Sequence, residues 1–280
     1  MLRLALRVRR DDAEIVLAEL LELAPNGVEE VDVDAGTVEY ALYGDPGELP
    51  QPPDLQAVAG GAFIGLSTTA LADDWAERWR EFHRPLVLGN RLCVRPPWEP
   101  PADTELDLVI DPGRAFGTGA HASTRLCLEF LLEMAGPPAS GSAVVDVGCG
   151  SGVLAIAAAK LGWPSVAALD YDPVCLQATA ANAAVNHVEL SAVRLFDLRS
   201  EPVMPARLVL ANLLAPLLNL WAQRMAADDL DHPDQIIASG LLVEEADGVS
   251  AAFAGCGYVQ TRRREHGGWT ALLLQKAGLG

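Results

Sequence analysis

The chain has 280 residues, half of them apolar, which is enough hydrophobic material for one large domain and a small one. Its formal net charge of −18 argues against nucleic acid as the main partner, because phosphate contacts need a basic surface. Residues 1–60 hold four basic and thirteen acidic side chains, a net charge of −9, which suits a basic protein partner but equally serves solubility.

Three further features bear on where the protein acts. No run of about 18 apolar residues occurs, so no membrane span is expected. Residues 1–10 place arginines within their apolar stretch, so we do not expect a signal peptide. The five cysteines form no C-x-x-C pair and are expected to be reduced, with no metal site. We therefore expect a cytoplasmic monomer without direct readout of nucleic acid.

Residues 1–60 are predicted to form a small α+β domain, because alternating and helical apolar patterns follow one another in a β-α-β-β order. This order is typical of the ferredoxin-like fold. The predicted elements are an edge strand over 2–9, a helix between Asp11 and Pro25, a hairpin over 28–33 and 37–43, and a short helix over 54–62.

Residues 61–100 are predicted to be a linker and pre-core segment. Asp73 can begin a helix, and a hairpin over 86–94 has Gly89 and Asn90 at its turn. Three aromatic side chains at helical spacing are expected to pack against the main domain: Trp75, Trp79 and Phe82.

Residues 101–280 are predicted to form a Rossmann-like α/β domain, because strands and helices alternate along them. In such a doubly wound sheet, ligands bind at the carboxyl ends of the strands. The predicted strands are 106–110, 143–147, 166–169, 208–211, 236–238, 258–263 and 269–274. The predicted helices are 123–134, 154–161, 173–186, 213–226 and 244–254.

The most informative motif joins the strand over 143–147 to its helix. Asp146 is followed by alternating glycines at 148, 150 and 152, and Asp170 lies 22 residues after the first of these. The dinucleotide fingerprint is G-x-G-x-x-G, and a carboxylate at 146 would repel a pyrophosphate. Asp146 instead suits the cationic methionine end of S-adenosylmethionine, and Asp170 can accept from both ribose hydroxyls. We predict that Asp146, Gly148, Gly150, Gly152 and Asp170 bind S-adenosylmethionine.

The loop over 111–124 is rich in glycine and hydroxyl side chains and precedes a helix. Ser123 or Thr124 can cap that helix, or Thr124 can meet the methionine carboxylate at its positive end. Glycines around Phe116 predict a mobile lid. His121 is a candidate for deprotonating an amine, although a structural role is the commoner one for a lone histidine.

Asn212 ends the predicted strand over 208–211, where it is expected to lie over the sulfonium of the cofactor. Its carboxamide oxygen can accept from an incoming amine and orient the lone pair of that amine. Leu213 and Leu214 stand where enzymes acting on planar amines have prolines, which favours an aliphatic amine. A helix cap is the alternative role for Asn212.

These motifs together resemble the bacterial ribosomal protein L11 methyltransferases, a family of class I methyltransferases. The resemblance covers nearly the whole chain and rests on Phe116-Gly117-Thr118-Gly119 with His121 and Thr124, Asp146-x-Gly-Cys-Gly-Ser-Gly, Asp170-x-Asp-Pro, Ala211-Asn212-Leu213-Leu214-Ala215, Ser239-Gly240-Leu241-Leu242 and Gly268-Trp269. The chain departs from the family pattern at Ala120, Ala122 and Leu213.

The resemblance implies an N-terminal domain that docks L11, and a catalytic domain that trimethylates lysine side chains and the N-terminal amine. It implies cofactor contacts at Thr124, Gly148, Asp170 and Asn212, with Asn212, His121 and Phe116 as the catalytic candidates. The alternatives are a class I methyltransferase for another protein lysine or a small-molecule amine, and a binding protein that uses the fold as a scaffold. A dehydrogenase is disfavoured by Asp146.

Overall fold

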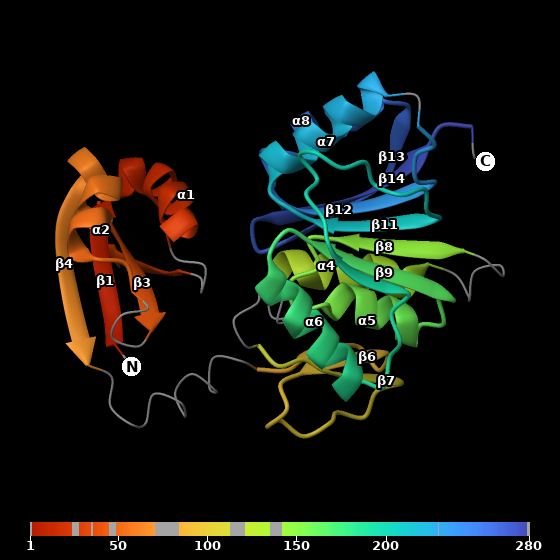
Figure 1. Ribbon diagram of the computed structural model, residues 1–280, viewed down its shortest axis with the longest axis horizontal. Helices are drawn as coiled ribbons and strands as arrows, with labels where there is room; N and C mark the ends of the chain where they lie inside the picture. Colours follow the sequence, from red (N-terminus) through yellow and green to blue (C-terminus); the bar gives the residue numbers. More distant parts are fainter. Residues whose placement is uncertain are drawn as a thin grey trace. The chain divides into compact units, whose positions relative to one another are not determined.

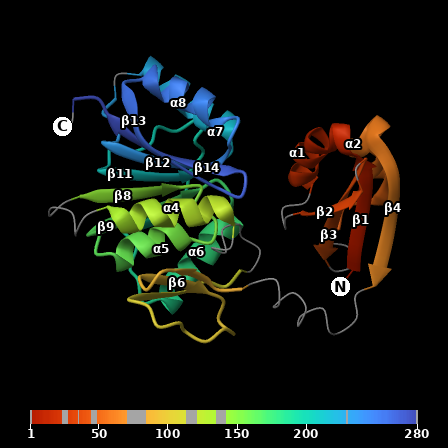
Figure 2. The ribbon, with the colours of Figure 1, turned by 180° about the vertical axis from the view of Figure 1, so that it is seen from behind.

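The computed structural model describes residues 2–23, 28–34, 36–44, 49–70, 84–112, 121–134, 142–228 and 230–278. The chain divides into two compact units, Met1–Phe82 and His83–Gly280, which are drawn in Figures 1 and 2. Each unit has a hydrophobic core of its own. No helix among the described residues is long and apolar enough to span a membrane.

The first unit is a four-stranded antiparallel sheet with two helices on one face (Figure 1). Its elements are β1 (Leu2–Arg9), α1 (Ala13–Leu23), β2 (Glu29–Asp34), β3 (Thr37–Gly44), α2 (Pro52–Ala59) and β4 (Phe63–Ala70). The alternation in β1 directs Leu4, Leu6 and Val8 into a core shared with α1 and α2. The strand order β2-β3-β1-β4 is that of the predicted ferredoxin-like domain.

This unit extends beyond the boundary predicted at residue 60. β4 pairs with β1 from Leu2 opposite Ala70 to Val8 opposite Phe63, so residues 63–70 complete the small sheet and are not a linker. This strand was not predicted, because Ser67, Thr68 and Thr69 interrupt the apolar alternation on this edge strand. The predicted helix with Trp75, Trp79 and Phe82 lies outside the described residues.

The second unit contains a seven-stranded sheet in the order β10-β9-β8-β11-β12-β14-β13. Its strands are β8 (Ala143–Val147), β9 (Ser165–Asp170), β10 (Ala192–Leu195), β11 (Leu208–Asn212), β12 (Gln235–Leu242), β13 (Tyr258–His266) and β14 (Trp269–Lys276). The first five strands in spatial order are parallel, and β14 runs antiparallel to both of its neighbours. The predicted doubly wound architecture and closing strand pair are confirmed.

Helices cover both faces of this sheet (Figures 1 and 2). They are α4 (Ala122–Glu133), α5 (Val153–Lys160), α6 (Pro173–Val185), α7 (Ala215–Ala227) and α8 (Ala246–Ala254). The side chains of α4, α5 and α6 pack into one core cluster, and those of α7 and α8 pack into the cluster on the opposite face. The strands between them are therefore buried on both faces, as their continuous apolar runs predict.

Two strands differ from the sequence-based expectation. β7 (Leu106–Val109) does not join the main sheet but pairs in parallel with β6 (Leu92–Arg95), which forms the predicted hairpin with β5 (Leu86–Leu88). This separate three-stranded sheet lies in the second unit, so residues 86–100 belong to that unit. β10 was not predicted, because this short edge strand is only partly buried and lacks a clear apolar pattern.

Candidate active site

The candidate site lies at the carboxyl ends of β8, β9 and β11. β8 lies between β9 and β11 in the sheet, and the helices that follow β8 and β11 pack on opposite faces. In doubly wound folds, ligands bind at the carboxyl ends of the strands where the winding reverses in this way. Asp146, Asp170 and Asn212 lie on these three strands, so the topology brings together residues that the sequence separates.

The turn after β8 requires its glycines. Gly148, Gly150 and Gly152 have φ angles of 74°, 52° and 81°, in the left-handed region that other residues rarely adopt. A Cβ atom on Gly148 would lie 2.4 Å from Leu213 Cδ2, and one on Gly152 would lie 2.8 Å from Thr179 Cγ2. The turn is fixed to β9 by Gly148 N–H, which donates to Leu169 O at 2.8 Å. Any side chain at position 148 or 152 would therefore collide with the neighbouring residues.

Leu213 is enclosed between two glycines. Its Cδ2 atom fills the space where Gly148 would carry a Cβ, and its carbonyl oxygen lies 2.6 Å from the Cβ position of Gly240, whose φ is 83°. Leu213 N–H also donates to Ser239 O at 2.9 Å. The segment after Asn212 thus packs directly against the glycine-rich turn on one side and against β12 on the other.

Asp170 ties the end of β9 to this turn. Its Oδ2 accepts from Gly150 N–H at 2.9 Å, and its Oδ1 accepts from Asp172 N–H at 3.0 Å. The residue is 6% exposed, and each oxygen retains a second lone pair. This orientation is compatible with acceptance from a pair of ribose hydroxyls. The adjacent Tyr171 is 73% exposed and was not among the predicted site residues.

Asp146 is a buried carboxyl group with one unsatisfied oxygen. Its Oδ2 accepts from Ala155 N–H at 3.0 Å, in the first turn of α5. Its Oδ1 has no hydrogen-bond partner among the described residues. Burial raises the pKa of Asp146 to about 7, and the negative charge of Asp170 acts in the same direction. A cationic group beside Oδ1 would stabilise the ionised form, so the site fits a ligand with an ammonium group.

Asn212 and Thr124 are in contact, although 88 residues separate them. Asn212 Nδ2 donates to Thr124 Oγ1 at 3.2 Å, and Thr124 is fully buried on α4. Asn212 Oδ1 is buried without a partner among the described residues. The hydrogen bond to Thr124 thereby fixes the orientation of the carboxamide, and its oxygen retains its capacity to accept. Asn212 does not cap α7, because the residue at the N-cap position is Leu214.

The structure assigns the cap of α4 to His121, where the sequence favoured Ser123 or Thr124. His121 Nδ1 accepts from Ser123 N–H at 3.3 Å and lies 2.7 Å from Ser123 Oγ. The ring also packs edge-on against Trp269, with centroids 4.6 Å apart. Burial lowers the pKa of His121, so the imidazole is neutral at pH 7. Phe116 and the glycines around it lie outside the described residues.

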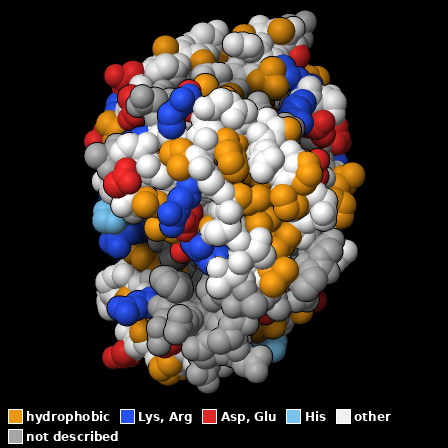
Figure 3. All heavy atoms as spheres, turned by 90° about the vertical axis from the view of Figure 1, so that its left-hand side faces the viewer, with side chains coloured by type: hydrophobic (Ala, Val, Ile, Leu, Met, Phe, Trp, Pro, Cys, Tyr) orange, Lys and Arg blue, Asp and Glu red, His pale blue; other side chains and the backbone are white. Residues whose placement is uncertain are grey.

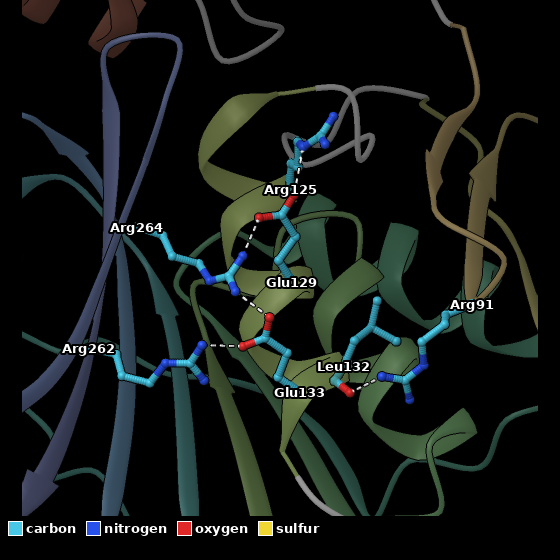
Figure 4. A network of polar contacts seen from close by, with 7 residues as sticks. All are labelled: Arg91, Arg125, Glu129, Leu132, Glu133, Arg262 and Arg264. Atoms are coloured by element: carbon cyan, nitrogen blue, oxygen red, sulfur yellow. Dashed lines mark hydrogen bonds and ion pairs between the residues drawn. The ribbon is translucent and has the colours of Figure 1, made fainter.

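A network of charged side chains holds α4 against β13 (Figure 4). Arg264 Nη1 donates to Glu129 Oε2 at 3.0 Å, and Glu133 accepts from both Arg262 and Arg264. Both guanidinium groups also lie over the ring of Phe130, at 5.4 and 5.3 Å from its centroid. Because α4 carries Thr124 and His121 at its other end, this network helps to fix the helix that supplies one side of the site.

The polar side chains of α6 were not predicted as part of the site, because only the apolar positions of this helix were considered. Thr179 Oγ1 donates to Gly150 O at 3.0 Å, and Asn182 Nδ2 donates to Ser151 O at 2.9 Å. Thr179, Asn182 and Asn186 recur at helical spacing, and all three are buried. This polar stripe was the feature of the sequence that could have indicated contacts between α6 and the glycine-rich turn.

Comparison with known proteins agrees with this geometry. The family model described as "Ribosomal protein L11 methyltransferase (PrmA)" matches residues 61–277. The ribosomal protein L11 methyltransferase of Symbiobacterium thermophilum is 40% identical over 206 residues, which cover 73% of this chain and 66% of that protein. That of Burkholderia vietnamiensis is 34% identical over 297 aligned positions, which cover 96% of each chain.

A solved structure is similar to this chain. The crystal structure of ribosomal protein L11 methylase from Lactobacillus delbrueckii subsp. bulgaricus superposes with a TM-score of 0.60 at 29% sequence identity. It covers 69% of this chain and 100% of the other.

Proposed function

The chain belongs to the ribosomal protein L11 methyltransferase family, and we propose that it transfers methyl groups from S-adenosylmethionine to amines of ribosomal protein L11. The observation that carries this proposal is the buried carboxamide of Asn212. Its nitrogen is engaged by Thr124 while its oxygen is left to accept. An acceptor at the end of β11, beside a glycine-rich turn with two acidic residues, suits the methylation of an amine.

The residues around the turn fit the cofactor. When bound, S-adenosylmethionine supplies the electrophilic methyl group. The main chain from Gly148 to Gly152 allows close approach, Asp170 accepts from the ribose hydroxyls, and Asp146 Oδ1 compensates the methionine ammonium group. Thr124 stands at the N-terminus of α4, where the helix dipole favours the methionine carboxylate. The exposed ring of Tyr171, next to Asp170, offers a flat apolar surface for the adenine.

The same residues prepare the substrate amine. A lysine side chain has a pKa of about 10.4 in water and must lose a proton before it can attack. Asn212 Oδ1 accepts an N–H of the neutral amine and so directs its lone pair towards the methyl group. His121 is proposed to lie beside the amine, where its Nδ1 accepts from Ser123 N–H, and Phe116 is proposed to cover the site. Trimethylation requires the amine to rotate between transfers.

The remaining parts of the proposal concern the substrate as a whole. The acidic first unit is proposed to dock the basic substrate protein, and the second unit to carry out the chemistry. Figure 3 shows hydrophobic side chains interspersed with acidic and basic ones, and the first unit exposes Ile15, Val33 and Ile64. A surface of this mixed kind is suited to protein recognition. We propose that the enzyme acts in the cytoplasm as a monomer, without reading nucleic acid.

The test is the intact mass of unmethylated L11 after incubation with the protein and S-adenosylmethionine. We expect a ladder of methyl increments, which Asn212→Ala should reduce at least about a hundredfold in rate while the variant still folds. Removal of residues 1–82 should abolish transfer to L11 and spare transfer to a small amine. No mass change, with cofactor binding demonstrated in the same sample, would refute L11 as the substrate.

A further inference from the structure

Helix α6 carries a buried polar side chain that contacts two separate parts of the site. Asn182 is 3% exposed and lies on the buried face of the helix with Thr179 and Ala183. Its Nδ2 donates to Ser151 O at 2.9 Å, within the glycine-rich turn. Its Oδ1 accepts from Asp111 N–H at 3.0 Å, just beyond β7. One side chain thus bridges main-chain groups that are 40 residues apart in the sequence.

The neighbouring turn of α6 provides a comparison. Asn186 is 4% exposed, and its side chain makes a pair of hydrogen bonds with Val109, accepting from N–H at 2.9 Å and donating to O at 2.7 Å. It also donates to Asn182 O at 2.8 Å but does not contact the glycine-rich turn. The two asparagines therefore have the same chemistry and burial, and only Asn182 reaches the cofactor turn.

Burial of an amide is unfavourable unless its hydrogen bonds are made, and an apolar residue would pack against the core without that cost. Both groups that Asn182 satisfies belong to segments flanking the site. Ser151 lies between Gly150 and Gly152, and Asp111 precedes the Phe116-Gly117-Thr118-Gly119 motif in the sequence. The hydrogen bonds therefore fix the distance between these two segments, which packing alone would leave less restrained.

We propose that Asn182 is a positioning residue for the cofactor: it holds the glycine-rich turn in its binding geometry by bridging Ser151 to Asp111. This rests on the proposed placement of S-adenosylmethionine at that turn. Asn182 acts through the main chain and is not itself a cofactor contact. Loss of its donor removes this hydrogen bond from the Ser151 carbonyl and allows the turn to relax.

The test uses Asn182→Asp, which retains an acceptor for Asp111 N–H but loses the donor to Ser151 O. Asn186→Asp is the matched control, since it makes the same change one turn along the helix. We expect Asn182→Asp to raise the Kd for S-adenosylhomocysteine about tenfold, measured by calorimetry below both melting temperatures. The control should change it less than about threefold. The KM for S-adenosylmethionine should rise in parallel, with a smaller change in kcat.

Equal increases in Kd for the two variants would show general loosening of α6 and would overturn the proposal, as would an unchanged Kd in Asn182→Asp. If the variant does not fold, the proposed bridge is tested by hydrogen exchange of the wild-type chain. Binding of S-adenosylhomocysteine should then slow exchange of the Asp111 amide, and an unaffected amide would overturn the bridge. Absence of binding to the wild-type chain would instead refute the proposed cofactor site.

Discussion

Asp146→Asn should make the free protein more stable while weakening its proposed cofactor site. The pKa of this carboxyl rises from its ordinary 3.8 to about 7 on folding, chiefly because it is buried. The folded chain therefore holds this proton more tightly than the unfolded chain does. The unfavourable contribution of Asp146 grows as the pH rises from about 4 to about 7 and is constant above that range.

The size of the effect follows from these pKa values. At 1.36 kcal/mol per pH unit, the raised pKa of Asp146 lowers the free energy of unfolding by about 4 kcal/mol at pH 8, where the folded carboxyl is ionised, and by about 2 kcal/mol at pH 5, where folding requires it to take up a proton. Asparagine removes this charge and can still accept from Ala155 N–H, the bond that Asp146 Oδ2 makes at 3.0 Å. The gain in free energy of unfolding should thus be several kcal/mol at pH 8 and about half as large at pH 5.

Urea unfolding followed by tryptophan fluorescence, at both pH values, measures this difference. Asp103→Asn, at an exposed position, is the control and should change stability by no more than about 0.5 kcal/mol. Calorimetry at pH 8 should show S-adenosylmethionine binding to Asp146→Asn about tenfold more weakly, because the methionine ammonium group loses its counter-charge. A variant no more stable than wild type at pH 8, or one whose advantage is the same at pH 5, would refute this reasoning.

Three further outcomes are expected. Asp170→Ala should raise the Kd for S-adenosylmethionine about a hundredfold, and an unchanged calorimetric Kd would remove Asp170 from the ribose site. Gly148→Ala should lower the free energy of unfolding in urea by about 2 kcal/mol, since its φ is 74° and its Cβ would lie 2.4 Å from Leu213 Cδ2. The double variant with Leu213→Ala should recover only the part of this loss that comes from the steric contact. Arg264→Met should lower the free energy of unfolding by about 1 kcal/mol more than the exposed control Arg199→Met, and equal effects would contradict a role for the α4–β13 network.

The local parts of the site could be predicted from the sequence because they depend on short-range patterns. Asp146 and the three glycines occupy one strand–turn–helix unit, and the parallel sheet brings Asp170 to the same edge. The apolar alternation of β1 likewise identified the small domain. In each case, the residues that define the feature lie close together in the chain or on adjacent strands.

The remaining features depend on contacts that no local pattern reports. Asn186 and Val109 lie 77 residues apart, and Arg262 and Glu133 lie 129 apart. These pairs form only once the helices are packed on the sheet. β4 was missed for a different reason: its polar residues lie on an edge strand, where burial imposes little pattern on the sequence.

The position of Leu213 between Gly148 and Gly240 has a consequence for redesigning this protein. A larger amine pocket would be sought by shortening side chains next to Asn212, and Leu213 is an obvious choice. The same side chain forms the wall against which the glycine-rich turn rests. A substitution at Leu213 would consequently alter both the range of substrates and the affinity for the methyl donor. Selection for a broader substrate range should therefore also yield substitutions in the glycine-rich turn.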